Sequence, residues 1–271
     1  MSWELNNFSM DNIAKDKFQG LITRARLRLL KMHYESHVGH IGGDLSCLDI
    51  LITLFHRIIE HEDTFVLSKG HAAGALYVTL WTIGKISEAE LKQFHQDGTR
   101  LAGHPVCGWL PEISFATGSL GHGLPLSAGV ALGKKLKGET GRVFCLMSDG
   151  EWNEGSNWEA IIFAVHHRLN NLIIVIDLNG LQGFGKTREI TDLHLISEKV
   201  SIFGANVFEV DGHNHEELEK AFLSQAKAPV VIIAHTVKGN GVSFMENKLE
   251  WHYLPLNQEQ YEKAVAEVEA K

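Results

Sequence analysis

Uninterrupted apolar stretches recur along the second half of the chain, and segments with helical spacing separate them. Three of these stretches read "RVFCLM" at 142–147, "NLIIVID" at 171–177 and "VVIIAHTV" at 230–237. Strands without polar alternation are typical of a parallel sheet that is covered by helices on both faces. The sequence therefore predicts an α/β fold, with a parallel sheet and helices on both faces.

The remaining expected elements extend this pattern. Two further strands are expected, "TFVLS" at 64–68 and "NVFEV" at 206–210. Helices are expected over residues 11–34, 44–58 with Asp44 as N-cap, 69–84, 124–138, 155–169, 214–226 and 257–270. Ser87 and Glu90 have the spacing of a capping box. Because no repeat, low-complexity segment or long linker divides the chain, we expect a single domain over residues 1–271.

The composition favours a protein that acts on small molecules. Of 271 residues, 44% are apolar and only 5 are proline, which is enough for a substantial core. The formal charge is −8 and the basic residues are dispersed, so no nucleic-acid partner is expected. No secretory leader and no apolar run of ~18 to 20 residues is visible, so no membrane partner is expected either. Three cysteines without a C-x-x-C pair indicate a reducing compartment, and we expect a cytoplasmic protein.

Histidine is unusually frequent, with 16 residues in the chain. Surface or helix-capping positions are expected for His56, His61, His95, His166, His167, His194 and His215. Turn or strand-end positions are expected for His37, His213 and His235. A zinc site built from histidines is an alternative, although no H-E-x-x-H or comparable local spacing supports it.

Oxygen-bearing side chains follow two neighbouring predicted strands. Asp149 lies just beyond the strand at 142–147, and Asn179 follows it by thirty residues, the length of one strand-helix-strand unit. Each motif alone is a common turn, but ligands bind at the carboxyl ends of parallel strands. A carboxylate, an amide oxygen and a backbone carbonyl suit Mg²⁺, which shares its other positions with phosphate oxygens. Gly150 lets backbone N–H groups approach an anion, so a metal-bound diphosphate site is predicted.

Together, "SDG" at 148–150 and "LNG" at 178–180 resemble the thiamin diphosphate motif. The surrounding sequence is similar to the N-terminal half of transketolases over nearly its whole length. The shared motifs occur in one order: "SHVGHIGGDLS", "FVLSKGHAAGALY", "AGHP", "ATGSLGHGL", "SDGEWNEGSNWEA", "DLNGLQ" and "TVKGNGVSFMEN".

The resemblance implies a thiamin diphosphate held through a divalent cation. The side chains of Asp149 and Asn179 and the carbonyl of Leu181 would bind Mg²⁺, or Ca²⁺ or Mn²⁺ in its place. Further cofactor contacts are implied for Gly150 and His71 near the diphosphate, Gly118 and Leu120 near the aminopyrimidine, and His252.

The resemblance also implies catalytic side chains. The histidines that would line the entrance to the thiazolium ring are His40, His71, His104 and His252. Imidazoles titrate near neutral pH, so they can hold sugar hydroxyls and carry protons. Glu154 and Glu159 resemble glutamates of an acid network that joins paired active sites, and we expect them to be buried acids at the start of a helix.

Three positions depart from the family pattern. His122 stands where the family often has Gln, and Ser148 replaces a frequent Gly before Asp149. Tyr253 follows His252 where the commoner pattern is His-Gly, and it adds bulk beside a histidine expected to bind substrate.

Family members also need a glutamate from a second, pyrimidine-binding domain, and this chain stops at Lys271, about where that domain would begin. We therefore expect one subunit of a split transketolase, which transfers a two-carbon ketol unit from a ketose to an aldose phosphate. A separately encoded C-terminal subunit, with pyrimidine-binding and C-terminal domains, would be its partner, two of each chain. The alternatives are another thiamin diphosphate-dependent enzyme, such as a deoxyxylulose-phosphate synthase-like enzyme or a specialised acyl or ketol transferase, and a non-catalytic module.

Overall fold

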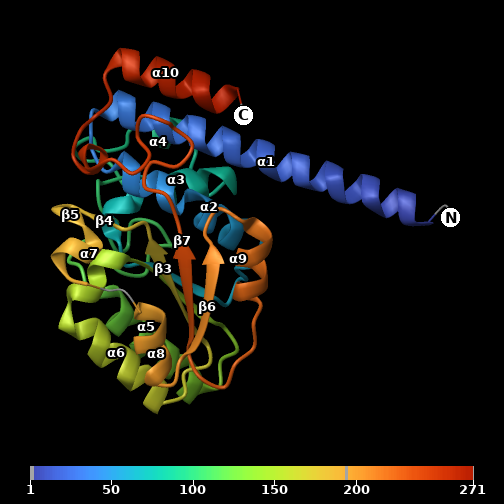
Figure 1. Cartoon of the computed structure of the whole chain (residues 1–271), viewed down its shortest axis with the longest axis vertical. Coiled ribbons are helices and arrows are strands. Elements are labelled where there is room, and N and C mark those ends of the chain that lie inside the picture. The colour runs from blue at the N-terminus through green and yellow to red at the C-terminus, as the bar shows by residue number, and fades with distance from the viewer. Residues whose placement is uncertain (1–2, 193–194, 271) are drawn as a thin grey trace.

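A five-stranded parallel sheet lies at the centre of the computed structural model, which describes residues 3–192 and 195–270 (Figure 1). The strands are β1 (Thr64–Leu67), β2 (Val143–Ser148), β3 (Leu172–Leu178), β6 (Asn206–Asp211) and β7 (Val230–His235). Their order across the sheet is β1-β2-β3-β7-β6, and every neighbouring pair is parallel. A short antiparallel pair, β4 (Leu181–Gln182) and β5 (Gly185–Lys186), follows β3.

Helices pack on both faces of this sheet, as Figure 1 shows. On one face lie α2 (Ile41–Arg57) and α9 (His215–Phe222), with α1 (Trp3–Ser36) and α3 (Ala73–Thr82) packed against α2 and with α10 (Gln258–Glu269) packed on α1, away from the strands. The other face is covered by α5 (Gly123–Lys137), α6 (Gly155–His166) and α8 (Ile196–Ile202). The shorter helices are α4 (Glu88–Leu91), α7 (Thr187–Ile190), η1 (Gly70–Ala72), η2 (Asp149–Asn153) and η3 (Leu249–His252). The predicted fold class is confirmed.

The apolar strands are explained by burial from two sides. In β2, Phe144 and Leu146 point into the core beneath α2 and α3, whereas Cys145 and Met147 point into the core beneath α5 and α6. Successive strand residues face opposite sides of a sheet, so both sets of side chains in a doubly covered strand are buried and most of them are apolar. The register pairs Ser148 of β2 with Asp177 of β3, which brings the carboxyl ends of the two strands together.

Some expected boundaries are corrected by the structure. Asp44 does not cap α2, because the helix already begins at Ile41, after His40 in a left-handed conformation (φ 70°). Asp44 is instead fully buried inside the helix, where its Oδ1 accepts a hydrogen bond of 2.8 Å from the N–H of Ala75. Its Oδ2 lies 2.9 Å from Nε2 of His33, so its carboxylate links α1, α2 and α3.

One local expectation is confirmed. Ser87 and Glu90 form the predicted capping box at the start of α4. Cys47, Cys107 and Cys145 are free thiols. Within residues 3–192 and 195–270, no helix is both long and apolar enough to cross a membrane.

We expect Leu146→Ala to lower the free energy of unfolding by about 2 to 5 kcal/mol, because Leu146 is 1% exposed in the interior strand β2 and its loss would leave a cavity. Leu136→Ala is the matched control, because Leu136 is 78% exposed on α5. Urea unfolding measured by circular dichroism checks both variants. Equal midpoints for the two would contradict the described core.

Candidate active site

A cavity of about 460 Å³ opens at the carboxyl ends of β2 and β3. Ten of the predicted site residues line it: His71, His104, Gly118, Leu120, Asp149, Gly150, Glu154, Asn179, Leu181 and His252. A smaller chamber of about 60 Å³ adjoins it and shares His71 and His104 with it. His40 lines this second chamber. The structure therefore brings together residues that lie far apart in the sequence.

Asp149 begins η2, directly beyond β2, and is 2% exposed. Its Oδ1 accepts a hydrogen bond from the N–H of Gly150 at 2.7 Å. Its Oδ2 accepts from the N–H of Gly180 at 2.9 Å and from the hydroxyl of Thr187 at 2.7 Å. Burial raises the pKa of Asp149, and the hydrogen bond from Thr187 opposes this shift. This carboxylate is thus fixed between the end of β2 and the loop after β3.

Asn179 is oriented by a buried ion pair that the sequence analysis missed. Asp177 and Lys69 are both fully buried and form a salt bridge. The Asp177 carboxylate also accepts hydrogen bonds from the hydroxyl of Ser46 at 2.6 Å and from Nδ2 of Asn179 at 3.3 Å. Burial alone would raise the pKa of Asp177, but the charge of Lys69 and the hydrogen bonds from Lys69, Ser46 and Thr236 together lower it. In the sequence, the Lys in "SKG" and the Asp that ends "NLIIVID" are charged residues next to apolar strands, which could have indicated this ion pair.

Lys238 is a second buried cation that the sequence analysis missed, in the motif "TVKGNG". It is 2% exposed, donates a hydrogen bond to the carbonyl of Leu181 at 3.2 Å and lies 3.0 Å from Nδ1 of His252. Among the described residues it forms no ion pair with a carboxylate. Burial lowers the pKa of Lys238 to about 8, and the nearby Lys69 adds to the shift. A buried ammonium with neutral partners is costly, so this position favours an anionic ligand.

Four histidines form a cluster at the cavity. The ring centroid of His40 lies 5.6 Å from that of His71, 5.9 Å from that of His104 and 5.2 Å from that of His252. Burial lowers the pKa of all four residues, and it brings that of His252 to about 3 with a contribution from the charge of Lys238. At neutral pH these rings are uncharged, and a neutral imidazole can donate at one nitrogen and accept at the other.

Glu154 and Glu159, expected as buried acids of a network that joins paired active sites, are exposed in the single chain. Glu154 precedes α6 and Glu159 lies on the outer side of its first turns. The buried acid is Glu151, which accepts hydrogen bonds from the N–H groups of Ser148 at 2.8 Å and Gly121 at 3.2 Å. Burial raises the pKa of Glu151. In the sequence, Ser148 and Glu151 have the spacing of a capping box, which could have indicated the role of Glu151. The structure forms this capping box at η2.

The other histidines have varied positions. His61, His95 and His166 are exposed, as predicted, whereas His56, His167 and His215 are partly buried. His37 is exposed with a φ of 53°, and His235, at the end of β7, is exposed and lies 2.9 Å from Glu209. His122 precedes α5 without a side-chain capping bond. His194 lies outside the described residues. Across the described ranges, no three His, Cys, Asp or Glu side chains are grouped to hold a metal, so the alternative zinc site is not formed there.

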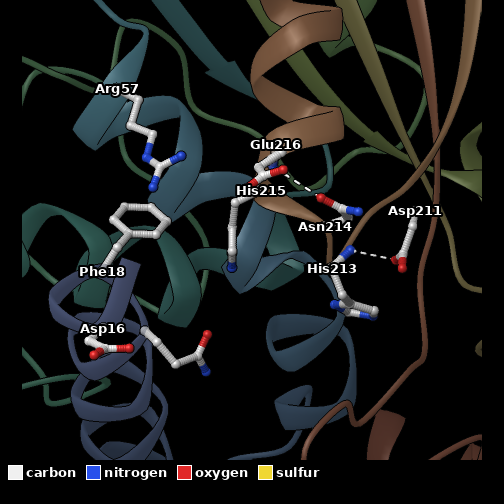
Figure 2. A pocket seen from close by; sticks show the side chains of 9 residues that line it. Asp16, Phe18, Arg57, Asp211, His213, Asn214, His215 and Glu216 are labelled. Atoms are coloured by element: carbon white, nitrogen blue, oxygen red, sulfur yellow. Dashed lines mark hydrogen bonds between the residues drawn. The ribbon is translucent and has the colours of Figure 1, made fainter. Parts of the chain in front are cut away.

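A larger cavity, of about 580 Å³, lies elsewhere, at the carboxyl end of β6 between α1, α2 and α9 (Figure 2). Its prominent polar groups already have protein partners. Both ring nitrogens of His213 are engaged, Nδ1 at 2.7 Å from Asp49 and Nε2 accepting from a backbone N–H. Nδ1 of His215 lies 2.8 Å from the Thr53 hydroxyl, and Arg57 stacks over a phenylalanine ring. These contacts indicate a structural role, and none of the predicted catalytic residues lines this cavity.

A parallel sheet with a ligand cavity at its carboxyl edge is typical of nucleotide- and diphosphate-binding α/β proteins. Here the buried cation Lys238 lines this cavity and favours an anionic ligand. A family model described as "transketolase, thiamine diphosphate binding domain" matches residues 20–268. The chain therefore belongs to the transketolase family, in its thiamine diphosphate-binding domain, as the resemblance implied.

Similar proteins include one subunit of the apulose-4-phosphate transketolase of Phocaeicola vulgatus, which is 40% identical over 90% of each chain. The 6-deoxy-6-sulfo-D-fructose transketolase subunit SqwG of a Clostridium species is 37% identical over 86% of this chain and 89% of its own. Human transketolase is 36% identical, and this chain spans 41% of its length. Among solved structures, transketolase from Campylobacter jejuni superposes with a TM-score of 0.87 at 28% identity, over 93% of this chain and 42% of its own.

We expect Lys238→Met to raise the stability of the ligand-free chain at pH 7 by about 1 to 3 kcal/mol. The pKa of Lys238 is lowered to about 8 in the folded state, so below about pH 8 its burial destabilises the folded state in full. This destabilisation disappears as pH rises to about 10, where the lysine of the unfolded chain also loses its proton. The advantage of the variant should therefore shrink between pH 8 and pH 10.

Urea unfolding at pH 7 and pH 10 checks this expectation. Lys186→Met is the control, because Lys186 lies on β5 and its side chain is exposed. A Lys238→Met chain that is less stable than the parent at pH 7 would show that Lys238 has enough partners without an anion.

Proposed function

We propose that the chain, as one domain over residues 1–271, is the diphosphate-binding subunit of a split transketolase. It would transfer a two-carbon ketol unit from a ketose to an aldose phosphate, together with a partner chain that carries the pyrimidine-binding and C-terminal domains. The observation that carries this proposal is the convergence of Asp149, Asn179 and Lys238 on one cavity beside four neutral histidines, with no carboxylate partner for Lys238 among the described residues. Two relatives of nearly equal length are named as transketolase subunits, which supports the split organisation.

The residues of the cavity fit a metal-bound thiamin diphosphate. Asp149, the amide oxygen of Asn179 and the carbonyl of Leu181 are the hard oxygen donors that Mg²⁺ prefers, and Ca²⁺ or Mn²⁺ could replace it. Lys238 would neutralise diphosphate charge, and Gly118 and Leu120 line the same cavity at the side proposed for the aminopyrimidine. When bound, thiamin diphosphate supplies the carbon nucleophile that cleaves the ketose.

The histidine cluster would handle the sugar. His40, His71, His104 and His252 are close enough to bind several hydroxyl groups of one small substrate. Because their pKa values are lowered, they would be neutral at pH 7 and able to accept a proton from a substrate hydroxyl and return it. The sugar phosphate would thus be positioned by this chain, while further contacts would come from the partner.

Glu154 and Glu159 would acquire their role on assembly. Both are exposed in this chain, and Ile162 and Phe163 on α6 are 50% and 39% exposed. Apolar side chains beside exposed acids suit a surface that another subunit covers. Two copies of each subunit would then place these acids between paired active sites. The three free thiols favour a cytoplasmic location for the protein.

We expect Asp149→Asn to weaken the binding of thiamin diphosphate at least about tenfold in the presence of Mg²⁺ and the partner chain, since it removes a charged metal ligand. Isothermal titration of the cofactor into the chain, alone and with the partner, checks this. Asp97→Asn, at an exposed position outside the cavity, is the matched control.

A coupled assay of ketol transfer completes the test. Turnover should require both chains, and robust turnover by this chain alone would overturn the split organisation. Cofactor binding with decarboxylation instead of ketol transfer would indicate a synthase. No binding under any condition would indicate a non-catalytic module.

A further inference from the structure

The exposed residues Tyr253 and Phe184 line the active-site cavity, and we call their side of the cavity its mouth. Tyr253 follows η3 and lines the cavity together with Gly183 and Phe184 of the β4–β5 turn. Its hydroxyl donates a hydrogen bond of 2.7 Å to the carbonyl of Gly183, seventy residues away in sequence. The side chain therefore joins two separate segments of the cavity wall.

We propose that Tyr253 and Gly183 form a latch that narrows this mouth and makes Tyr253 a specificity-determining residue, which selects short ketose donors over longer ones. The inference rests on the proposed function. The ring of Tyr253 stands edge-on to that of His252, with centroids 4.8 Å apart, so it borders the place where a substrate hydroxyl would be held. Its 54% exposure leaves part of the ring open to a ligand.

The position of Tyr253 depends on two glycines, Gly183 and Gly39, which leave space for it on two sides. A Cβ atom on Gly183 would lie 2.5 Å from the Tyr253 hydroxyl oxygen, and one on Gly39 would lie 2.5 Å from the Tyr253 carbonyl oxygen. Neither distance is compatible with a side chain unless Tyr253 moves. The N–H of His40 also donates to the carbonyl of His252 at 3.2 Å. The segment that bears Tyr253 is therefore held between the His40 loop and the β4–β5 turn.

The chemistry of the latch predicts which sugars it favours. The hydroxyl proton of Tyr253 is donated to Gly183, so its oxygen remains an acceptor for one sugar hydroxyl. The ring occupies space that additional carbons of a longer ketose would need, and Phe184, 89% exposed at the same turn, extends this apolar rim. For comparison, discrimination by one methylene in a hydrophobic pocket is typically about 10- to 200-fold.

The test uses the complex with the partner chain and a series of ketose phosphate donors with five, six and seven carbons. Tyr253→Gly should raise the ratio of kcat/KM for the seven-carbon donor over the five-carbon donor about tenfold or more, because the ring is gone. Tyr253→Phe keeps the ring and breaks only the hydrogen bond, so its shift should be smaller. Gly183→Ala displaces the hydroxyl from the other side and should act in the same direction as Tyr253→Phe.

Tyr261→Phe, on α10, is the control for Tyr253→Phe. An unchanged donor ratio in Tyr253→Gly would overturn the latch, and so would an equal loss for all donors, which indicates a stabilising role only. Titration of thiamin diphosphate separates the two proposals. If the parent complex binds no cofactor, the proposed function fails, whereas normal binding and turnover with an unchanged ratio contradict the latch alone.

Discussion

The ion pair between Lys69 and Asp177 is the interaction on which the arrangement of the site depends. Both side chains are fully buried, and removing two charges from water is costly unless hydrogen bonds satisfy them. They are satisfied here by Ser46 and the carbonyl of Gly43, both on α2, and by Thr236 just beyond β7. The pair therefore joins the ends of three strands to α2, and the turn that carries His71 begins directly after Lys69.

The charges of the cavity follow from this pair. Because Lys69 is neutralised by Asp177, it contributes little free charge, yet it still lowers the pKa of its neighbour Lys238. Lys238 is left with a carbonyl and an imidazole, whereas Asp149 is left with hydrogen-bond donors but no cation among the described residues. One buried cation and one buried carboxylate, each without a charged partner in the part of the chain that is described, are what a metal diphosphate would complement.

The sequence was informative where burial or topology imposes a pattern. Strands covered on both faces are largely apolar, so β2, β3 and β7 were predictable, and Asp149 and Asn179 followed from their strand ends. Lys238 and Asp177 were not, because charged residues are usually exposed and only tertiary packing buries these two. Asp44 was expected to be an N-cap because it stands at the start of an apolar helical pattern. Its carboxylate instead contacts His33, distant in sequence, and the N–H of Ala75 in the first turn of α3. The burial of Glu154 and Glu159 was expected from a family resemblance that concerns an assembly, whereas the chain by itself leaves them in solvent.

The same features explain why such a chain would work within an assembly. Buried groups with incomplete partners reduce the stability of the free chain, and any ligand that binds only the folded state recovers that free energy. A cofactor that also contacts a second chain would couple its own binding to association, because each event orders groups that the other requires. Tyr253 extends this coupling to the substrate side, since its neighbour His252 lies 3.0 Å from Lys238, which in turn contacts the carbonyl of Leu181. The side chains of His252 and Lys238 therefore connect Tyr253 to the carbonyl of Leu181, which we propose as a metal ligand.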